Sequence, residues 1–269
     1  NDRPGIILSS SIKKYIDYYG VKCGQKLSLF TNNDSTYETA ISLNKSGVNV
    51  NSIIDIRDKS NSSIVKHAEK LGIKIHWKHT VVNTSGYKRI NSIEIMKLSD
   101  DGSNVIGNKI NQNCDCLGIS GGWTPMVHLF TQSGGKLKFR DIDNIFLPDK
   151  ASSDQISIGS CNGDFELDDI LKNSNNYIKK ILNIDNSDYD NLDIICSKET
   201  DKKNIWLLPS NKKFGKTKPF LDFQNDSTAK DVKLALREGF KSIEHVKRYT
   251  TTGMGTDQGK LSNMHALGI

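Results

Sequence analysis

Apolar strand patterns alternate with helical patterns between residues 25 and 77, and this alternation constrains the fold more than any other feature. The segments are residues 25–30, 35–47, 48–56, 62–71 and 73–77. Ser35, followed three residues later by Glu38, predicts a capping box at the start of the first helix. Strands that alternate with helices form parallel sheets. We therefore predict a doubly wound, Rossmann-like α/β unit, with a further helix before it at residues 10–18.

The turn after the first predicted strand is where a dinucleotide-binding unit carries the pattern G-x-G-x-x-G. Here the turn reads Thr31-Asn-Asn-Asp-Ser-Thr36 and contains no glycine. Asp34 would place a negative charge against a pyrophosphate. Asp55, at the end of the second strand, could accept a ribose hydroxyl, although a structural role is the stronger interpretation. We expect this unit not to hold a dinucleotide tightly.

Short antiparallel strands are predicted next, at residues 90–98 and 104–110. Cys114–Ile119 has the pattern of a buried strand, in which Cys114 and Cys116 share one face as small core residues. Connecting structure is expected at residues 136–146. Residues 156–163 predict a last short strand with a glycine turn, followed by a helix at Leu167–Leu182. Residues 183–217 are interpreted as a polar linker whose apolar island, Ile205–Pro209, is a strand.

Residues 219–250 predict two consecutive helices. Thr228 and Asp231 indicate a capping box at the first helix, and Gly239 indicates its end. A second helix is expected to begin at Ser242, with an apolar face made by Ile243, Val246 and Tyr249.

The loop that follows, Thr250–Lys260, concentrates groups that bind anions. Its three glycines allow backbone N–H groups to approach an anion closely, and basic side chains lie on both sides. The candidate anion-binding residues are Lys247, Arg248, Thr252, Gly253, Gly255 and Lys260. An ordinary helical hairpin with a flexible exit is the alternative, because glycine-rich loops alone are weak signals.

Composition excludes several function classes. The chain has 269 residues and a dispersed net charge of +6, without the basic, aromatic-rich stripe of a nucleic-acid-binding surface. We expect no nucleic-acid partner. It has no apolar run long enough for a membrane span and no signal peptide. Five scattered cysteines fit reduced thiols in a cytoplasmic protein. Because the chain lacks an initial methionine and stops within a helical pattern, we expect a fragment of a longer protein.

Catalytic and metal-binding patterns are not evident. His76 and His79 are the nearest candidate pair, but their spacing on one strand would place the rings on opposite faces. His128 and His265 lie in apolar runs, which is typical of core histidines. We therefore predict no catalytic residue and no metal site.

Three stretches carry a specific resemblance: DFQNDSTAKDV, REGFKSIEHVKRYTTTGMGTDQGK and the closing SNMHALGI. They resemble the alpha subunit of heterotetrameric sarcosine oxidases, where it joins its dinucleotide-binding part to its folate-binding part. The same unit is more distantly similar to the iron–sulfur domain of amine and opine dehydrogenases. The positions that match the cluster cysteines are Asp222, Gln224, Thr252 and Asp257. Since cluster iron is held by Cys thiolates, we expect a helical domain of this type without a cluster.

The resemblance covers the whole chain and implies an architecture similar to two-domain disulfide-oxidoreductase flavoproteins. It implies an inserted Rossmann-like nucleotide domain at 1–115, the C-terminal part of the outer FAD/NAD-type domain at 116–182, and a linker with the helical domain at 183–269. Ser120–Pro125 resembles the turn that returns to the outer domain. The resemblance places NAD against the outer domain's last turn, formed by Gly159, Ser160, Cys161, Gly163, Phe165 and Leu167.

The activity that the resemblance implies is oxidation of sarcosine to glycine, with transfer of the one-carbon unit to tetrahydrofolate. The implied partners are the beta, gamma and delta subunits. FAD and FMN belong to the complex, with FMN at the alpha–beta interface against Lys247–Lys260, and tetrahydrofolate binds a C-terminal domain beyond these residues. Two alternatives stay open: the corresponding subunit of an N-methylglutamate dehydrogenase, and a nucleotide-holding scaffold that serves assembly alone.

Overall fold

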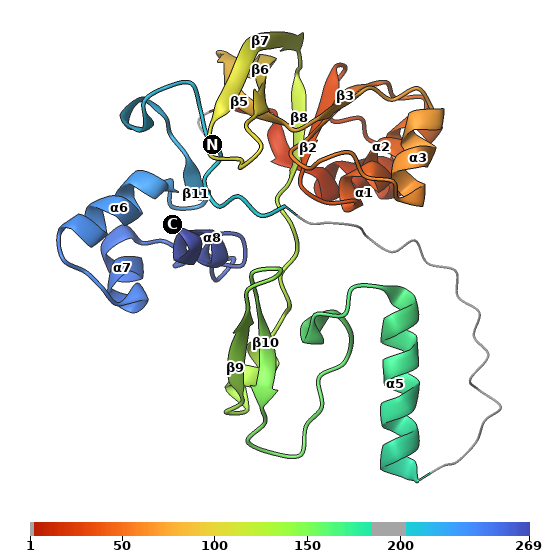
Figure 1. Ribbon diagram of the computed structural model, residues 1–269, viewed down its shortest axis with the longest axis vertical. Coiled ribbons are helices and arrows are strands. Elements are labelled where there is room, and N and C mark those ends of the chain that lie inside the picture. The colour runs from red at the N-terminus through yellow and green to blue at the C-terminus, as the bar shows by residue number, and fades with distance from the viewer. Residues whose placement is uncertain (1–2, 184–202) are drawn as a thin grey trace.

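The computed structural model describes residues 3–183 and 203–269, in three parts (Figure 1). A Rossmann-like unit occupies residues 6–120, a hairpin and a long helix follow within residues 128–182, and a mainly helical unit occupies residues 214–268. The predicted fold class is confirmed: an α/β region of the two-dinucleotide-binding type precedes a small helical unit. The domain limits at residues 115 and 182 stay predictions.

Five parallel strands form the sheet of the Rossmann-like unit in the order β1-β8-β2-β3-β4. Their bounds are β1 (Ile6–Leu8), β2 (Leu27–Thr31), β3 (Val50–Asp55), β4 (Ile75–Trp77) and β8 (Cys116–Ser120). The helices that connect successive strands are α1 (Ser9–Tyr19), α2 (Ser35–Lys45) and α3 (Ser63–Lys70). The central strand β2 pairs with β8 on one side and with β3 on the other, so its end is the middle of the sheet's carboxyl edge.

The two faces of this sheet are covered differently. Leu29 belongs to a core cluster with residues of α1, α2 and α3, whereas Phe30, its neighbour, packs into a second cluster. That second cluster lies under an antiparallel meander made by β5 (His79–Gly86), β6 (Ile90–Leu98) and β7 (Val105–Asn113). On the face covered by helices, the packing leaves no room for a side chain at Gly118. A Cβ added there would lie 2.6 Å from the Leu29 side chain and 2.7 Å from that of Ile12.

Two predictions for this unit were wrong, and one strand was missed. Strand β5 was not predicted, because its polar sequence shows little alternation and its conformation depends on pairing with β6. No capping box forms at Ser35: it is the first helical residue, and the N-cap position is Asp34, whose backbone is already helical. Cys114 and Cys116 do not share a face, since Cys114 lies before β8 and packs under the meander while Cys116 packs under the helices.

The middle part begins where β8 ends. It contains α4 (His128–Gln132), the hairpin strands β9 (Lys136–Arg140) and β10 (Ile145–Lys150), the 3₁₀ helix η1 (Gly159–Asn162) and α5 (Leu167–Leu182). The helix was predicted correctly, but the strand predicted at residues 156–163 was wrong. Gly159 and Gly163 have φ angles of 79° and 81°, and this left-handed backbone turns the chain instead of extending it.

The helical unit contains η3 (Phe214–Lys216), β11 (Phe220–Asp222), β12 (Ser227–Thr228), α6 (Ala229–Arg237), α7 (Ile243–Thr250) and α8 (Asn263–Gly268). The capping box of Thr228 and Asp231 is confirmed. The predicted apolar face of α7 was wrong in part, because Val246 is buried but Ile243 and Tyr249 are 38% and 47% exposed. Ile205–Pro209 is irregular rather than a strand, and the rest of the predicted linker, residues 184–202, lies outside the described residues.

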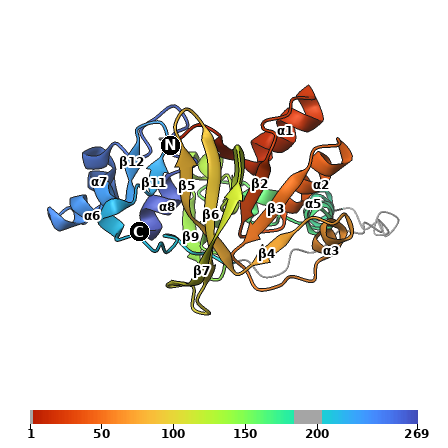
Figure 2. The same cartoon turned by 90° about the horizontal axis from the view of Figure 1, so that it is seen from above.

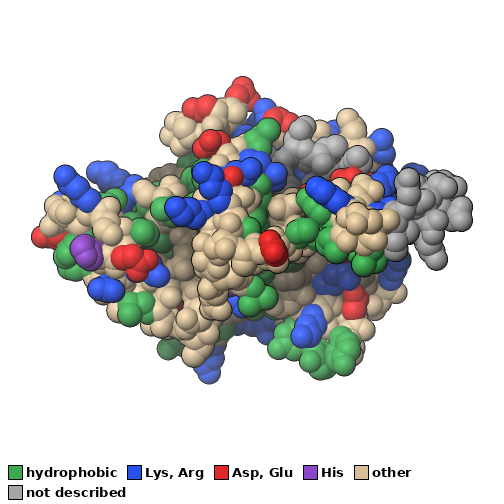
Figure 3. All heavy atoms as spheres, turned by 90° about the horizontal axis from the view of Figure 1, so that it is seen from below, with side chains coloured by type: hydrophobic (Ala, Val, Ile, Leu, Met, Phe, Trp, Pro, Cys, Tyr) green, Lys and Arg blue, Asp and Glu red, His purple; other side chains and the backbone are tan. Residues whose placement is uncertain are grey.

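Seen from above, the helical unit lies on one side of the meander and helices α1–α3 lie on the other (Figure 2). Seen from below, hydrophobic side chains are exposed between Lys and Arg (Figure 3). The exposed apolar residues of α5 are Leu167, Leu171, Tyr177, Ile178, Ile181 and Leu182. Within residues 3–183 and 203–269, no helix combines the length and apolar character that a membrane crossing requires.

Candidate functional site: the carboxyl edge of the sheet and the adjoining cavity

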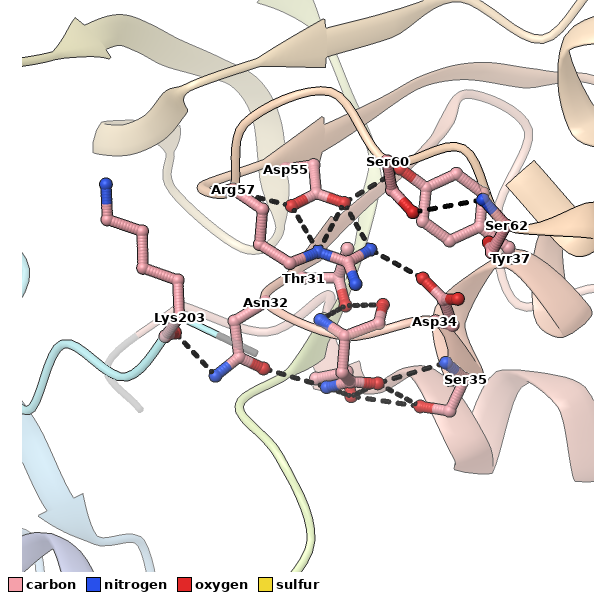
Figure 4. Close-up of polar contacts among 12 residues, drawn as sticks. Thr31, Asn32, Asp34, Ser35, Tyr37, Asp55, Arg57, Ser60, Ser62 and Lys203 are labelled. Carbon is pink, nitrogen blue, oxygen red and sulfur yellow. Dashed lines mark hydrogen bonds and ion pairs between the residues drawn. The ribbon is translucent and has the colours of Figure 1, made fainter. Parts of the chain in front are cut away.

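The turn after β2 is closed by its own side chains (Figure 4). Asn33, which is only 1% exposed, donates from Nδ2 to Asn32 Oδ1 at 2.8 Å and to Ser120 Oγ at 3.0 Å. Its Oδ1 accepts from the backbone N–H of Ser35 at 3.0 Å. The side chains of this turn are therefore hydrogen-bonded to one another and to the end of β8. A glycine-rich turn at the same position would lack these side chains and leave room for a pyrophosphate.

Arg57 occupies the neighbouring position at the end of β3. Its Nη2 lies 2.8 Å from Asp55 Oδ2 and 2.8 Å from Asp34 Oδ1. Tyr37 donates its hydroxyl to Asp55 Oδ2 at 2.8 Å, and all four side chains are nearly or completely buried. Burial, followed by the charge of Asp55, raises the pKa of Tyr37, so it stays a neutral donor.

These contacts do not fit a dinucleotide held across β2 and β3. Asp55 was considered as a ligand for a ribose hydroxyl, yet Oδ1 accepts from the backbone N–H of Arg57 at 2.9 Å and from its Nε at 3.1 Å. Oδ2 is bonded by Tyr37 and Arg57. Both oxygens of Asp55 are therefore already bonded, and Asp34 pairs with the guanidinium of Arg57. The expectation that this unit holds no dinucleotide tightly stays a prediction.

A cavity of about 490 Å³ opens on the other side of β2, between the Rossmann-like unit, the middle part and the helical unit. Its walls are mainly apolar and aromatic, which is typical of small-molecule sites. They include Phe30, Ile119, Trp123, Phe165, Trp206, Phe220, Phe223, Leu261 and Met264, together with the polar residues Asn32, Asn33, Ser120, Lys260 and His265.

Asn32 forms hydrogen bonds to two segments at the edge of the cavity. Its Nδ2 donates to the carbonyl of Gly121 at 3.1 Å. The same group donates to the carbonyl of Lys203 at 3.2 Å (Figure 4). The next residue, Asn204, donates from Nδ2 to the carbonyl of Asp143 at 3.1 Å. The segment that leads into the helical unit is therefore bound both to the sheet edge and to the β9–β10 hairpin.

Two functional groups of the helical unit face this cavity. His265 meets Trp206 edge to face, with ring centroids 5.9 Å apart. Burial lowers the pKa of His265 and outweighs a hydrogen bond to the Leu261 backbone. That bond uses the single N–H of a neutral ring and leaves the other ring nitrogen as an acceptor. Lys260 has no ion-pair partner within the described part of the chain and is exposed at the cavity's edge.

The residues predicted to bind an anion do not lie together in the structure. The backbone N–H of Gly253 donates to Asp222 Oδ2 at 2.7 Å, and Thr252 is fully buried. Lys247 Nζ lies 3.8 Å from Glu244 Oε1, and Arg248 is exposed. Gly255 lies against Gln224, whose Oε1 would be 2.4 Å from an added Cβ. Of the six candidates in this loop, Lys260 alone lines the cavity.

The positions that match cluster cysteines carry an internal hydrogen-bond network. Asp222 accepts from the backbone N–H groups of Gln224, Asn225 and Gly253 at 2.7–3.0 Å. Burial opposes its ionisation, but these donors hold the pKa of Asp222 below its ordinary value. Gln224 Oε1 accepts from Thr256 at 2.6 and 2.8 Å. In the described residues, no group of three or more His, Cys, Asp or Glu side chains could hold a metal ion.

In the predicted nucleotide turn, Gly159–Leu167, some of the hydrogen-bond donors are already bonded within the turn. The N–H groups of Gly163 and Asp164 donate to carbonyls of the same turn, at 3.2 Å each, and Cys161 Sγ donates to the carbonyl of Ile158 at 3.1 Å. Helix α5 carries Asp168 and Asp169 in its first turn. Phe165 lines the cavity, so the structure brings it to the same space as Lys260, while Gly159, Ser160, Cys161, Gly163 and Leu167 stay outside its walls.

The histidine predictions require correction. His76 and His79 do not lie on one strand, because β4 ends before Lys78, whose φ is 54°, and β5 begins after it. Their ring centroids are 5.5 Å apart. His128 is exposed rather than in the core, and His265 faces the cavity. Arg57 was not predicted as a residue of this site. Its position two residues after Asp55 could have indicated an ion pair with that carboxylate.

The fold of the whole chain has a counterpart among solved structures. The whole chain superimposes on 49% of the L-proline dehydrogenase from P. horikoshii with a TM-score of 0.59 and 17% identity, a likeness of fold. Sequence comparison then identifies the relatives. Residues 216–269 match the sarcosine oxidase A3 domain.

The relatives extend this match to the complete chain. It is 30% identical over 283 residues to sarcosine oxidase subunit alpha of Corynebacterium sp. strain P-1, and 31% identical over 280 residues to that of Rhizobium meliloti strain 1021. Both alignments cover 100% of this chain and, respectively, 28% and 26% of the relative. The predicted resemblance to the sarcosine oxidase alpha subunit is therefore confirmed, and the chain spans about a quarter of those relatives' length.

Proposed function

We propose that this chain is part of the alpha subunit of a heterotetrameric sarcosine oxidase, and that its role there is to bind nucleotide and partner subunits. The observation that carries the proposal is the match of the complete chain to two sarcosine oxidase alpha subunits. The complex would oxidise sarcosine to glycine and transfer the one-carbon unit to tetrahydrofolate. The beta, gamma and delta subunits would be its partners. The reduced state of the four described cysteines fits a cytoplasmic complex.

The catalytic groups of such a complex would lie outside these residues. At the buried sheet edge Arg57 is ion-paired with both Asp34 and Asp55, which suits a structural role better than proton transfer. We assign no catalytic residue and no metal ligand to this chain. Redox chemistry would be supplied by FAD and FMN in the complex, and tetrahydrofolate would bind a separate C-terminal domain. An iron–sulfur cluster is not proposed, since Asp222 and Gln224 offer oxygen ligands already bonded within the loop.

NAD would be held at the outer turn, Gly159, Ser160, Cys161, Gly163, Phe165 and Leu167, but weakly by this chain alone. Two N–H groups of the turn are already bonded within it, and two carboxylates in the first turn of α5 oppose a pyrophosphate. Calorimetry of the chain with NAD should show no micromolar affinity. Micromolar binding would contradict this part of the proposal.

FMN at the alpha–beta interface would meet the loop of Lys247, Arg248, Thr252, Gly253, Gly255 and Lys260. Two features support this: Arg248 and Lys260 are exposed cations, and an arginine can bind a phosphate through two hydrogen bonds. Arg248→Glu and Lys260→Glu should reduce flavin retention or subunit association in the reconstituted complex. Lys241→Glu, an exposed charge reversal before α7, is the control. Unchanged flavin content and assembly in both variants would mean that the loop is only a connector.

Flavin reduction in the reconstituted complex tests the activity itself. Reduction after addition of sarcosine supports the proposal. Reduction with N-methylglutamate and not with sarcosine would assign the chain to an N-methylglutamate dehydrogenase. Reduction by neither substrate, with the complex assembled, would leave a scaffold that serves assembly, an alternative that the closed end of β2–β3 favours.

A further inference from the structure

Lysine side chains gather where the helical unit meets the antiparallel meander. This lysine patch consists of Lys212, Lys213, Lys216, Lys230 and Lys233. We propose that the lysine patch binds an acidic surface of a partner subunit. The inference rests on the proposed function, which gives the chain partner subunits. It deepens that function by assigning the face of the chain that a partner contacts and the charge of the partner's surface.

The patch is assembled from two segments of the helical unit. Residues 212–218, in the segment that leads into β11 (Figure 1), contain four lysines and no acidic residue. On α6, Lys230 donates from Nζ to the carbonyl of Gly215 at 2.8 Å. Lys233 Nζ lies 4.5 Å from the centre of the Phe214 ring. Lysines of the segment and of the helix are thus brought to one surface.

The patch also reaches the Rossmann-like unit. Lys212 Nζ donates to Asn83 Oδ1 on β5 at 2.8 Å. The positive charge therefore extends across the joint between the two units, and a partner that covers the patch would contact both. None of the five lysines lines the cavity between the units, so the patch is a separate surface.

These charges are not neutralised by the chain itself. Within the described part of the chain, none of the five lysines forms an ion pair. Glu94, on the strand that pairs with β5, places Oε2 3.2 Å from Lys109 Nζ. Asp231, on α6, accepts from the backbone N–H of Thr228 at 2.7 Å. Lys230 is half-buried and the other four lysines are exposed, so the patch presents uncompensated positive charge to solvent.

The chemistry of the patch favours a protein surface over a nucleic acid. Single-stranded nucleic acids bind where cations alternate with aromatic rings on which the bases stack. Phe214, the aromatic ring of this region, lies beneath Lys233 and packs against the core cluster of the helical unit. Lysine is also a flexible point charge and lacks the planar geometry with which arginine binds a phosphate. Clustered charges of this kind accelerate association with an oppositely charged protein surface.

Association kinetics of the full chain with the beta, gamma and delta subunits test the proposal. Lys213→Glu combined with Lys216→Glu reverses two exposed charges. Neither side chain makes a hydrogen bond within the described residues, so the variant should fold, which circular dichroism checks. At an ionic strength of about 0.1 M we expect association about tenfold slower than in the wild type. At about 1 M, where charges act over only about 3 Å, the two rates should be equal.

Lys66→Glu combined with Lys70→Glu is the matched control. It makes the same change in net charge with two exposed lysines of α3, and α3 lies on the side of the meander opposite the helical unit (Figure 2). Its association rate should stay close to that of the wild type.

Four results would each overturn the proposal. They are no association of the wild-type chain with the subunits, an unchanged rate for the patch variant at about 0.1 M, equal slowing in the control, and slowing that persists at about 1 M. A single-stranded oligonucleotide is the remaining probe. If it bound the wild type and not the patch variant, while subunit association was the same in both, the patch would be a nucleic-acid surface instead.

The lysine patch and the proposed activity can fail separately. Flavin reduction by sarcosine, in a complex whose assembly is unaffected by Lys213→Glu with Lys216→Glu, would refute the patch alone. Slower assembly of this variant, in a complex whose flavin is reduced by neither sarcosine nor N-methylglutamate, would refute the activity alone.

Discussion

Two carboxylates and one guanidinium share the buried end of β2 and β3, and the guanidinium of Arg57 is the group that makes this arrangement stable. Arg57, Asp55 and Asp34 are 2%, 0% and 8% exposed. A charge in such a place is tolerated when it is paired and hydrogen-bonded, and it becomes costly when its partner is removed. The Coulombic and hydrogen-bonding contacts with both carboxylates outweigh burial and raise the pKa of Arg57, so it stays charged at every pH in which the protein is folded.

Arg57→Met should therefore destabilise the protein strongly. The substitution leaves Asp34 and Asp55 buried without a cation, which costs about 3–5 kcal/mol in comparable buried pairs. Urea unfolding followed by circular dichroism measures the change. Lys13→Met is the matched control, because Lys13 forms an exposed pair with Asp17 on α1 and should alter the free energy of unfolding by less than about 1 kcal/mol. A loss as small as that for Arg57→Met would show that the guanidinium is dispensable.

His76 predicts a pH dependence. Burial, together with the positive charges of Lys74 and His79, lowers the pKa of His76 from 6.5 to about 4. Between these values the unfolded chain binds a proton that the folded chain does not bind, so stability is complete above pH 6.5 and is lost as the pH falls toward 4. His76→Gln should lose less stability over this interval, by up to about 3 kcal/mol.

Unfolding free energies of the wild type and His76→Gln at pH 7 and pH 4.5 measure this difference. His245→Gln, an exposed histidine on α7, is the control and should follow the wild type. If His76→Gln lost as much stability as the wild type on acidification, the neutral imidazole would not be the group responsible.

At the scale of elements, helix α6 offers a direct comparison of two caps. Thr228 accepts from the backbone N–H of Lys230, and Asp231 accepts from the backbone N–H of Thr228 at 2.7 Å. Ser242 occupies the N-cap position of α7 but makes no side-chain cap bond. Thr228→Ala should cost about 1 kcal/mol of stability, and Ser242→Ala should cost clearly less. Thermal unfolding of the two variants measures the contrast, and equal losses would contradict the role of the capping box.

The elements that sequence predicted are those whose signals are local. Thr228 with Asp231, and the helix at Leu167–Leu182, depend on neighbours within a few residues. Strand β5 was missed because a strand with a polar sequence is stabilised by its partner β6. The cap at Ser35 failed because Asp34, the preceding residue, pairs with Arg57 through space.

Residues of the candidate site, like the helices and strands, were predictable from sequence only where a local pattern marks them. Asp34 and Asp55 were noted in the turn after the first strand and at the end of the second, but not as partners of Arg57. Lys260 was predicted because of its loop. Trp206 and His265 were not, since they meet at the cavity from positions 59 residues apart in the sequence. A contact of that kind depends on how the two units dock, which no local pattern records.

At the scale of the whole molecule, the chain contains separate cores. The two clusters of the Rossmann-like unit and the cluster of the helical unit have no buried residue in common. Hydrogen bonds of the intervening segment join the units: Asn32 to Lys203, Asn204 to Asp143, and Lys212 to Asn83. With separate cores and few polar links, the helical unit can open locally while the parallel sheet stays folded.

Asn32→Ala should therefore increase local opening of the helical unit selectively. The substitution removes the donors to Gly121 and Lys203, and one or two lost hydrogen bonds correspond to about 1–2 kcal/mol. Hydrogen exchange followed by mass spectrometry should show faster exchange in peptides of α6, α7 and α8, with peptides of β3 unchanged. Asn51→Ala is the matched control: Asn51 donates to the carbonyl of Asn113 at 2.9 Å within the Rossmann-like unit, so exchange in α6–α8 should stay as in the wild type. If Asn32→Ala accelerated exchange equally in both units, or in neither, the docking of the helical unit would not depend on this contact, and the cavity between the units would need another support.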